Sequence, residues 1–150
     1  MEENILEIVE KSCRIHRDVI AVKYLSHREI VEKSYGDLWD DIRKTAVILR
    51  NKGLCGTHIA LVGSSSYEWI CAYMAILFTG NTAVPLDANL SAPELHELLN
   101  RSESTALFCG ASRKDVITEL TDDCPEMNIV FTMEKKVDIC LLYTSQSTRE

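Results

Sequence analysis

The chain has 150 residues and a formal net charge of −7, from 16 Lys and Arg against 23 Asp and Glu. Its hydrophobic content of 46% and charged content of 26%, with only 6 Gly and 3 Pro, are typical of a globular protein and exclude a disordered one. An acidic balance without a basic stripe also argues against a nucleic-acid partner, because binding to a polyanion needs clustered Lys and Arg.

Neither export nor membrane insertion is expected. The longest apolar run, residues 69–78, is about half of the ~20 residues needed to cross a bilayer. The acidic amino terminus is unlike that of a signal peptide. The six cysteines include no C-x-x-C pair, which argues against a zinc ribbon or thioredoxin motif. We therefore predict a reduced, cytoplasmic protein with no transmembrane segment and no metal site.

The amino-terminal part predicts a helix, a β-hairpin and a second helix. Strands over residues 19–24 and 29–33 flank a polar turn and form the hairpin. Ser34 and Asp37 form a capping box that begins the second helix, which Gly53 ends. The first helix has a predicted buried face made of Ile5, Ile8, Val9, Ser12 and Cys13.

Strands and helices alternate through the rest of the chain. Strands separated by helices pair in parallel through right-handed crossovers. The predicted fold is therefore α/β: a layered, largely parallel sheet with flanking helices, preceded by the amino-terminal helix and hairpin. The predicted strands cover residues 58–62, 82–86, 105–109, 128–133 and 138–143, and the predicted helices cover residues 67–79, 91–101 and 112–120.

The helix over residues 67–79 is apolar on nearly all sides, so it is expected to be buried on most of them. Two arrangements fit this pattern. Either further protein packs around the helix, or the helix is central and lies between other elements of this chain.

Polar features in the chain favour structural roles. The loop 63–66 follows a strand and precedes a helix, where phosphate can bind, but it lacks both G-x-G-x-x-G and a P-loop ending and is better interpreted as an ordinary turn. Asp40 and Asp41 are interpreted as solvated surface. The scattered histidines, for which surface or hydrogen-bonding roles are favoured, are His16, His27, His58 and His96.

Four motifs, in order, carry a resemblance to a known family. Residues 34–38 (SYGDL), 53–61 (GLCGTHIAL), 66–69 (SYEW) and 76–87 (ILFTGNTAVPLD) resemble the family patterns [ST]-Y-x-E-L, G-x-x-x-G-D-x-V-A-L, N-S-x-E-[WF] and L-x-x-G-x-x-x-V-P-[LI]-D. The chain thus resembles AMP-forming adenylating enzymes, which include acyl-CoA synthetases, luciferases and peptide-synthetase adenylation domains. The resemblance extends from about residue 5 to residue 133 and is nearest to long-chain fatty acyl-CoA synthetases.

This resemblance implies that residues 1–139 are the amino-terminal portion of an AMP-binding domain, with the remainder missing. The parent enzyme would join a carboxylic acid, such as a fatty acid, to ATP as an acyl-adenylate and then to CoA as a thioester. ATP, Mg²⁺ and CoA would serve the parent. We expect none of them to bind this fragment well, because the family's catalytic and metal-binding residues lie downstream; the chain alone is expected to be inactive.

The last residues, 140–150, resemble the start of the family's phosphate loop, Y-T-S-G-[ST]-T-G-x-P-K. Gln146 and Arg149 replace its glycines, and no lysine follows; a Cβ at either position hinders close backbone approach to phosphate. Residues 140–145 also match a translated transposon-derived sequencing adapter, so this segment is either a truncated phosphate loop or a sequence artefact. The candidate ATP-binding residues of this degenerate loop are Thr144, Ser145, Ser147 and Thr148.

Two other functions remain open at this point. A peptide-synthetase adenylation domain would share the same motifs and differ only downstream. A stand-alone, non-catalytic α/β binding or interaction module would account for the missing glycines and lysine.

Overall fold

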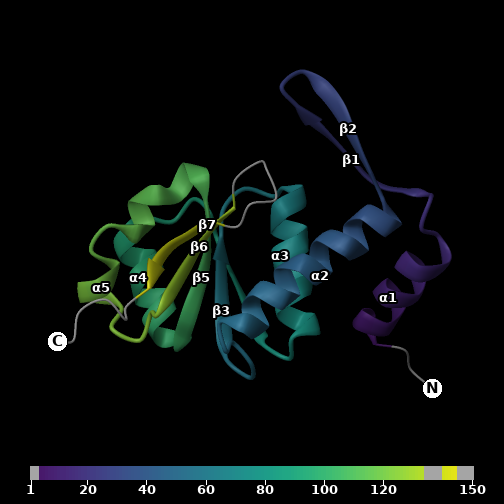
Figure 1. The fold of residues 1–150 in the computed structure, drawn as a ribbon. Coiled ribbons are helices and arrows are strands. Elements are labelled where there is room, and N and C mark those ends of the chain that lie inside the picture. The colour runs from purple at the N-terminus through teal and green to yellow at the C-terminus, as the bar shows by residue number, and fades with distance from the viewer. Residues whose placement is uncertain (1–3, 134–139, 145–150) are drawn as a thin grey trace.

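The computed structural model describes residues 4–133 and the backbone of residues 140–144. In it a five-stranded sheet lies between two helical layers, and a two-stranded hairpin with its neighbouring helix projects to one side (Figure 1). The elements are α1 (Ile5–Ile15), β1 (Ile20–Ser26), β2 (Glu29–Ser34), α2 (Tyr35–Asn51), β3 (His58–Val62), α3 (Tyr67–Phe78), β4 (Thr82–Leu86), α4 (Ala92–Arg101), β5 (Ser104–Gly110), the 3-10 helix η1 (Ala111–Ile117), α5 (Leu120–Asp123), β6 (Ile129–Met133) and β7 (Cys140–Thr144).

The large sheet has the order β4-β3-β5-β6-β7, and all its pairs are parallel except β6 with β7. This confirms the predicted α/β fold with a largely parallel sheet. Parallel neighbours need a crossover of about a dozen residues, and only residues 134–139 separate β6 from β7. The last strand therefore runs antiparallel.

Alternate residues of the central strands enter two separate cores. In β3, Ile59 and Leu61 contact the core under α2 and α3, whereas Ala60 and Val62 contact the core under α4 and α5. The same alternation in β5 sends Phe108 to the first core. Because successive side chains of a strand point to opposite faces, a strand with helices on both faces is apolar throughout, as these strands are.

Helix α3 lies between the sheet and α2 (Figure 1). Its Cys71, Ala72, Ala75 and Ile76 are buried, while Ile70 on its outer side is 37% exposed. Burying a large aliphatic side chain such as Ile76 stabilises the fold by about 1.5–3 kcal/mol. Of the two arrangements that the sequence left open, the central helix is the one that the structure shows.

The buried face of α1 differs from the prediction. Leu6, Val9 and Cys13 pack against the first core, whereas Ile5 and Ile8 are 64% and 47% exposed. Apolar residues form two overlapping stripes on this helix that share Val9, and helical periodicity alone cannot choose between them. Contact with α2 and α3 decides that the stripe with Leu6, Val9 and Cys13 is the buried one.

The predicted hairpin is confirmed, and one acidic side chain fastens it to the helices. The carboxylate of Asp41 in α2 accepts a hydrogen bond of 2.9 Å from the hydroxyl of Tyr67 in α3 and lies 3.5 Å from the Lys33 ammonium of β2. The Tyr24 ring of β1 stacks on Tyr67 with centroids 5.7 Å apart. We call Tyr24, Lys33, Asp41 and Tyr67 the Asp41 cluster.

The interpretation of Asp41 as solvated surface is wrong, because the residue is only 5% exposed. Burying a carboxylate is costly unless hydrogen bonds and opposite charges compensate it, and the cluster provides both. Burial also raises the pKa of the Tyr67 hydroxyl, so this group remains a donor to Asp41. Two helices and the hairpin thus converge on one carboxylate.

The helix predicted over residues 112–120 is replaced by the 3-10 helix η1 and the short α5. Arg113 has non-helical dihedral angles (φ −118°, ψ 34°), and Glu119 adopts a left-handed conformation with φ of 63°. The carbonyl of Arg113 accepts a hydrogen bond from the Cys109 thiol at 3.0 Å. The sequence Val-Ile-Thr at residues 116–118 also has low helix propensity.

Strands β3 and β5 continue into loops whose backbones touch. A Cβ atom built on Gly110 would lie 3.1 Å from the Cα of Gly63, and one built on Gly63 would lie 3.1 Å from the Cα of Gly110. Both glycines are therefore required by this close approach.

Replacing Gly110 by Ala tests this contact. We expect Gly110→Ala to lower the free energy of unfolding by about 1–3 kcal/mol, because two backbone segments must separate. Urea unfolding followed by circular dichroism measures the change. The control is Ser64→Ala at an exposed position of the neighbouring loop, which should change stability by less than about 0.5 kcal/mol; equal effects of the two variants would contradict the assignment.

A double-mutant cycle tests the Asp41 cluster. Asp41→Asn and Tyr67→Phe should show a coupling free energy of about 1–3 kcal/mol in urea unfolding, because they remove the two partners of one buried, charge-assisted hydrogen bond. Lys44, which also contacts Asp41 at 3.1 Å but is 68% exposed, provides the comparison: Lys44→Gln should couple to Asp41→Asn less strongly. Additive effects of the first pair would show that the hydrogen bond contributes nothing.

Candidate functional site

The carboxyl ends of the parallel strands are the first place to look for a binding site. After β3 the chain passes to α3 on one face of the sheet, whereas after β5 it passes to η1 on the other face. Two neighbouring strands whose connections pass to opposite faces of the sheet form a topological switch point. Open α/β sheets usually bind ligands in the crevice beyond the carboxyl ends of these two strands. The candidate site is therefore the edge near Gly63 and Gly110.

The loop after β3 behaves as a strand-to-helix turn. The hydroxyl of Ser66 accepts a hydrogen bond from the backbone N–H of Trp69 at 3.1 Å, which satisfies one of the free donors at the start of α3. Gly63 lies against Gly110, so the space between the two strand ends is filled by backbone.

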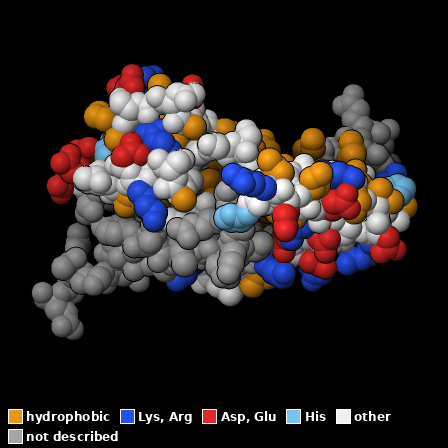
Figure 2. Space-filling view, turned by 90° about the horizontal axis from the view of Figure 1, so that it is seen from above, with side chains coloured by type: hydrophobic (Ala, Val, Ile, Leu, Met, Phe, Trp, Pro, Cys, Tyr) orange, Lys and Arg blue, Asp and Glu red, His pale blue; other side chains and the backbone are white. Residues whose placement is uncertain are grey.

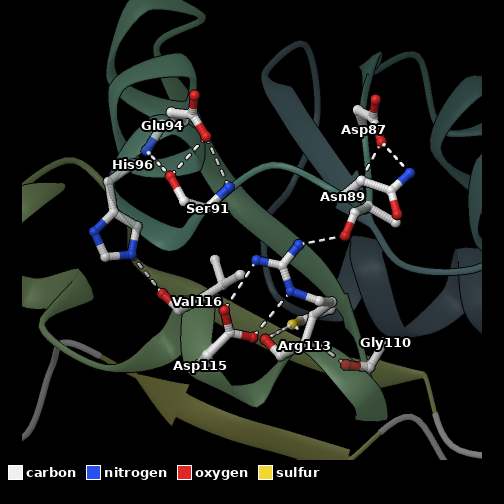
Figure 3. A network of polar contacts seen from close by, with 11 residues as sticks. Asp87, Asn89, Ser91, Glu94, His96, Gly110, Arg113, Asp115 and Val116 are labelled. Atoms are coloured by element: carbon white, nitrogen blue, oxygen red, sulfur yellow. Dashed lines mark hydrogen bonds and ion pairs between the residues drawn. The ribbon is translucent and has the colours of Figure 1, made fainter.

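Arg113 ties two loops together at this edge (Figure 3). Its guanidinium donates to the carbonyl oxygen of Ala88 at 2.5 Å and makes two hydrogen bonds of 2.9 Å to the Asp115 carboxylate. On the Ala88 side, the carboxylate of Asp87 accepts hydrogen bonds from the backbone and side chain of Asn89. We call Asp87, Asn89, Arg113 and Asp115 the carboxyl-edge network.

In this network, Arg113 and Asp115 stabilise each other's charged form. The hydrogen bond to Asp115 raises the pKa of Arg113, and the same bond lowers the pKa of Asp115. The Arg113 side chain is only 13% exposed, and its donors are directed at Ala88 and Asp115. This arrangement positions the β4–α4 loop and supplies neither a nucleophile nor an acid–base pair.

Buried thiols and histidines do not add a catalytic group. Burial raises the pKa of Cys71 to about 12 and that of Cys109 to about 11, so these thiols remain protonated and are poor nucleophiles at neutral pH. His58 lies with Nδ1 2.6 Å from the carbonyl oxygen of Ser102, and His96 is enclosed between two acceptors. Both therefore have the hydrogen-bonding role that the sequence favoured.

A magnesium or other metal site finds no support in residues 4–133. Within the described part of the chain, no group of three or more His, Cys, Asp or Glu side chains is arranged to hold a metal ion. Among the helices described, none combines the length and the apolar character that a bilayer crossing requires.

The predicted phosphate-loop residues lie at the end of the chain. Thr144 is the last residue of β7, and its backbone is in register with Ile129 at the start of β6. Thr144 therefore lies toward the amino-terminal edge of the parallel strands, across the sheet from the carboxyl-edge network. Ser145, Ser147 and Thr148 lie outside the described residues, as does the side chain of Thr144, so their role in binding ATP stays a prediction.

Sequence reasoning missed Arg113 and its partners. Arg113 and Ala88 are 25 residues apart, and no local motif marks either of them. The one available signal was the short spacing of Arg113 and Asp115, which is common on any surface.

The chain is similar in sequence to known proteins. The sequence model of a family described as AMP-binding enzyme matches residues 9–149. A CoA ligase of Gibberella moniliformis is 32% identical over 101 residues, which cover 61% of this chain and 17% of that protein. A polyketide synthase–nonribosomal peptide synthetase of Aspergillus flavipes is 21% identical over 159 aligned positions, which cover 97% of this chain and 4% of that protein.

Among solved structures, the crystal structure of coronafacic acid ligase from Pectobacterium brasiliense superposes with a TM-score of 0.79 at 25% identity. The superposition covers 89% of this chain and 26% of the ligase. The chain thus spans about a quarter of that ligase and 17% of the Gibberella CoA ligase.

The pKa of Asp115 gives a direct test of the carboxyl-edge network. In Arg113→Gln, the Asp115 pKa should rise toward the ordinary aspartate value of about 3.9, because the charged hydrogen-bond donor that lowers it is gone. Carboxyl-carbon NMR titration measures the shift. A carboxyl group with a lowered pKa in the folded state stabilises that state at a pH above the ordinary value, and this stabilisation is lost as the pH falls. The stability of the variant should therefore depend less on acid pH than that of the native chain.

Glu94 is the internal control for this titration. Its pKa is lowered by hydrogen bonds from Ser91 in the capping box of α4, without any contribution from Arg113. The Glu94 pKa should therefore stay low in Arg113→Gln. An unchanged Asp115 pKa in the variant would show that Arg113 and Asp115 do not pair in solution.

Proposed function

Because the chain belongs to the AMP-binding enzyme family, whose model matches residues 9–149, we propose that it forms the amino-terminal part of the adenylating domain of an AMP-forming acid–thiol ligase. That family match, over most of the chain, is the observation that carries the proposal. A CoA ligase relative at 32% identity and the superposition on coronafacic acid ligase support the ligase branch.

The whole enzyme would catalyse two successive displacements. In the first, a carboxylate oxygen of the substrate attacks the α-phosphorus of ATP, the bond to the β,γ-phosphates breaks, and acyl-adenylate and pyrophosphate result. In the second, the thiol of CoA attacks the acyl carbon and AMP leaves, which gives the thioester and releases a proton. The substrate is a carboxylic acid, for which we propose a fatty acid, and the reaction takes place in the cytoplasm.

The described residues contribute a scaffold to this reaction. The sheet between α3 and α4 carries the chain to β7, and residues 140–150, which begin with that strand, would form a degenerate edge of the phosphate loop. Thr144, Ser145, Ser147 and Thr148 would offer hydroxyl groups to ATP there, while Mg²⁺ finds no ligand set in residues 4–133. We therefore place the magnesium, the CoA and the catalytic side chains of the parent beyond this chain, and divide the chain itself into a scaffold, residues 1–139, and the loop edge.

A peptide-synthetase adenylation domain is the second candidate. Its support is the alignment of the Aspergillus flavipes synthetase with 97% of this chain. A stand-alone binding or interaction module is the third, and its support is the replacement of the phosphate-loop glycines by Gln146 and Arg149.

Exchange of pyrophosphate into ATP tests catalysis by the chain itself. We expect the 150-residue chain to show no exchange above background with fatty acids or amino acids, because residues 4–133 hold no group of side chains arranged to bind a metal ion and Gln146 and Arg149 replace the phosphate-loop glycines. A complete adenylating enzyme of the family provides the positive control. Robust exchange that depends on a carboxylic acid would contradict the scaffold proposal, and its acid preference would identify the branch.

A transplant tests the scaffold role directly. Residues 9–133 can replace the aligned segment of coronafacic acid ligase, whose backbone they match. The chimera should keep the host's acid preference, because the described residues do not select the substrate. A folded chimera whose acid preference changes would show that these residues take part in substrate recognition.

A further inference from the structure

His96, on the buried side of α4, faces a hydrogen-bond acceptor with each of its ring nitrogens. The residue is 4% exposed. Nε2 lies 2.5 Å from the carbonyl oxygen of Val116 in η1, as Figure 3 shows, and Nδ1 lies 2.6 Å from a carboxylate oxygen of Asp123 in α5. One imidazole thus joins three elements that are separate in sequence.

The two partners decide the protonation state of the ring. A neutral imidazole has one N–H and one lone pair, so it can donate to only one acceptor. A backbone carbonyl and an ionised carboxylate have no proton to give. Both short contacts of His96 are therefore hydrogen bonds only when both ring nitrogens carry protons.

We propose that His96 is a pH-responsive clamp, which as an imidazolium ties α4 to η1 and α5 and as a neutral ring releases one of them. When the ring loses a proton, a nitrogen lone pair faces an oxygen at 2.5–2.6 Å, and this repulsion separates the two groups. The clamp lies outside the proposed scaffold role in adenylation and does not depend on it.

Acidic side chains from three segments surround the His96 ring. His96 lines a pocket of about 300 Å³ together with Asp115 of η1, Glu119 of the following turn and Asp123 of α5, and its described lining includes no Lys or Arg. Of these three carboxylates, Asp115 is paired with the Arg113 guanidinium at 2.9 Å. Nearby negative charges stabilise a cation. From β5 the only titratable group in this core is the Cys109 thiol, which stays neutral because burial raises its pKa to about 11.

The clamp has a mechanical consequence because α5 is short. Four residues form only one helical turn (Leu120–Asp123), and such a turn depends on tertiary contacts for its stability. Besides His96, the side chain of Asn100 in α4 donates to the backbone carbonyl of Asp123, and the Cys124 thiol lies 3.4 Å from the carbonyl oxygen of His96. A neutral ring that releases Asp123 therefore loosens one of the ties between α4 and α5 that the structure describes.

NMR of the ring nitrogens in the 150-residue chain tests the protonation state. His16 and His27, which are exposed, serve as references within the same sample. At a pH slightly above the ordinary histidine value of about 6.5, both nitrogens of His96 should remain protonated. A neutral His96 ring with one bare nitrogen under those conditions would overturn the proposal.

Unfolding at two pH values tests the clamp. Between about pH 5.5 and about pH 8.5, the equilibrium constant for folding should fall about tenfold more in the native chain than in His96→Gln, because only the native chain has the clamp to lose. His27→Gln is the matched control and should behave like the native chain. If His96→Gln fails to fold, Asp123→Asn replaces it and should likewise reduce the pH dependence; an unreduced dependence in the folded variant contradicts the clamp.

Discussion

Burial of α3 is the constraint on which the rest of this fold depends. The helix is apolar on nearly all sides, so it needs the sheet on one side and α2 on another. That placement brings the hydroxyl of Tyr67 to Asp41, and Asp41 in turn holds the hairpin through Lys33. Hydrophobic side chains are exposed in small groups between charged ones on the face that Figure 2 shows. In the hairpin, Leu25 and Ile30 are each 72% exposed.

The two edges of the sheet have different roles. At the carboxyl edge, Arg113 joins the loops around Ala88 and Asp115, and the contact between Gly63 and Gly110 fills the switch point with backbone. The register of β7 brings Thr144 toward the opposite edge, beside Ile129. A site built after β7 would thus draw little from the carboxyl-edge network, whose contacts serve to hold loops in place.

Membership of the AMP-binding enzyme family agrees with this division. In the described part of the chain, no group of three or more His, Cys, Asp or Glu side chains is arranged to hold a metal ion, and burial raises the pKa of the Cys71 and Cys109 thiols. The chain spans about a quarter of the coronafacic acid ligase with which it superposes.

The sequence by itself determined the order of elements, the capped helix starts at Ser34 and Ser91 and the family, because periodicity, capping and motif spacing are local properties of the chain. Only the tertiary structure decided which stripe of α1 is buried, that Asp41 lies in the core, and that η1 replaces a regular helix. It also decided which atoms His96 and Arg113 meet. Apart from the kink at Arg113, these outcomes depend on partners twenty or more residues away, and local pattern carries no information about such partners.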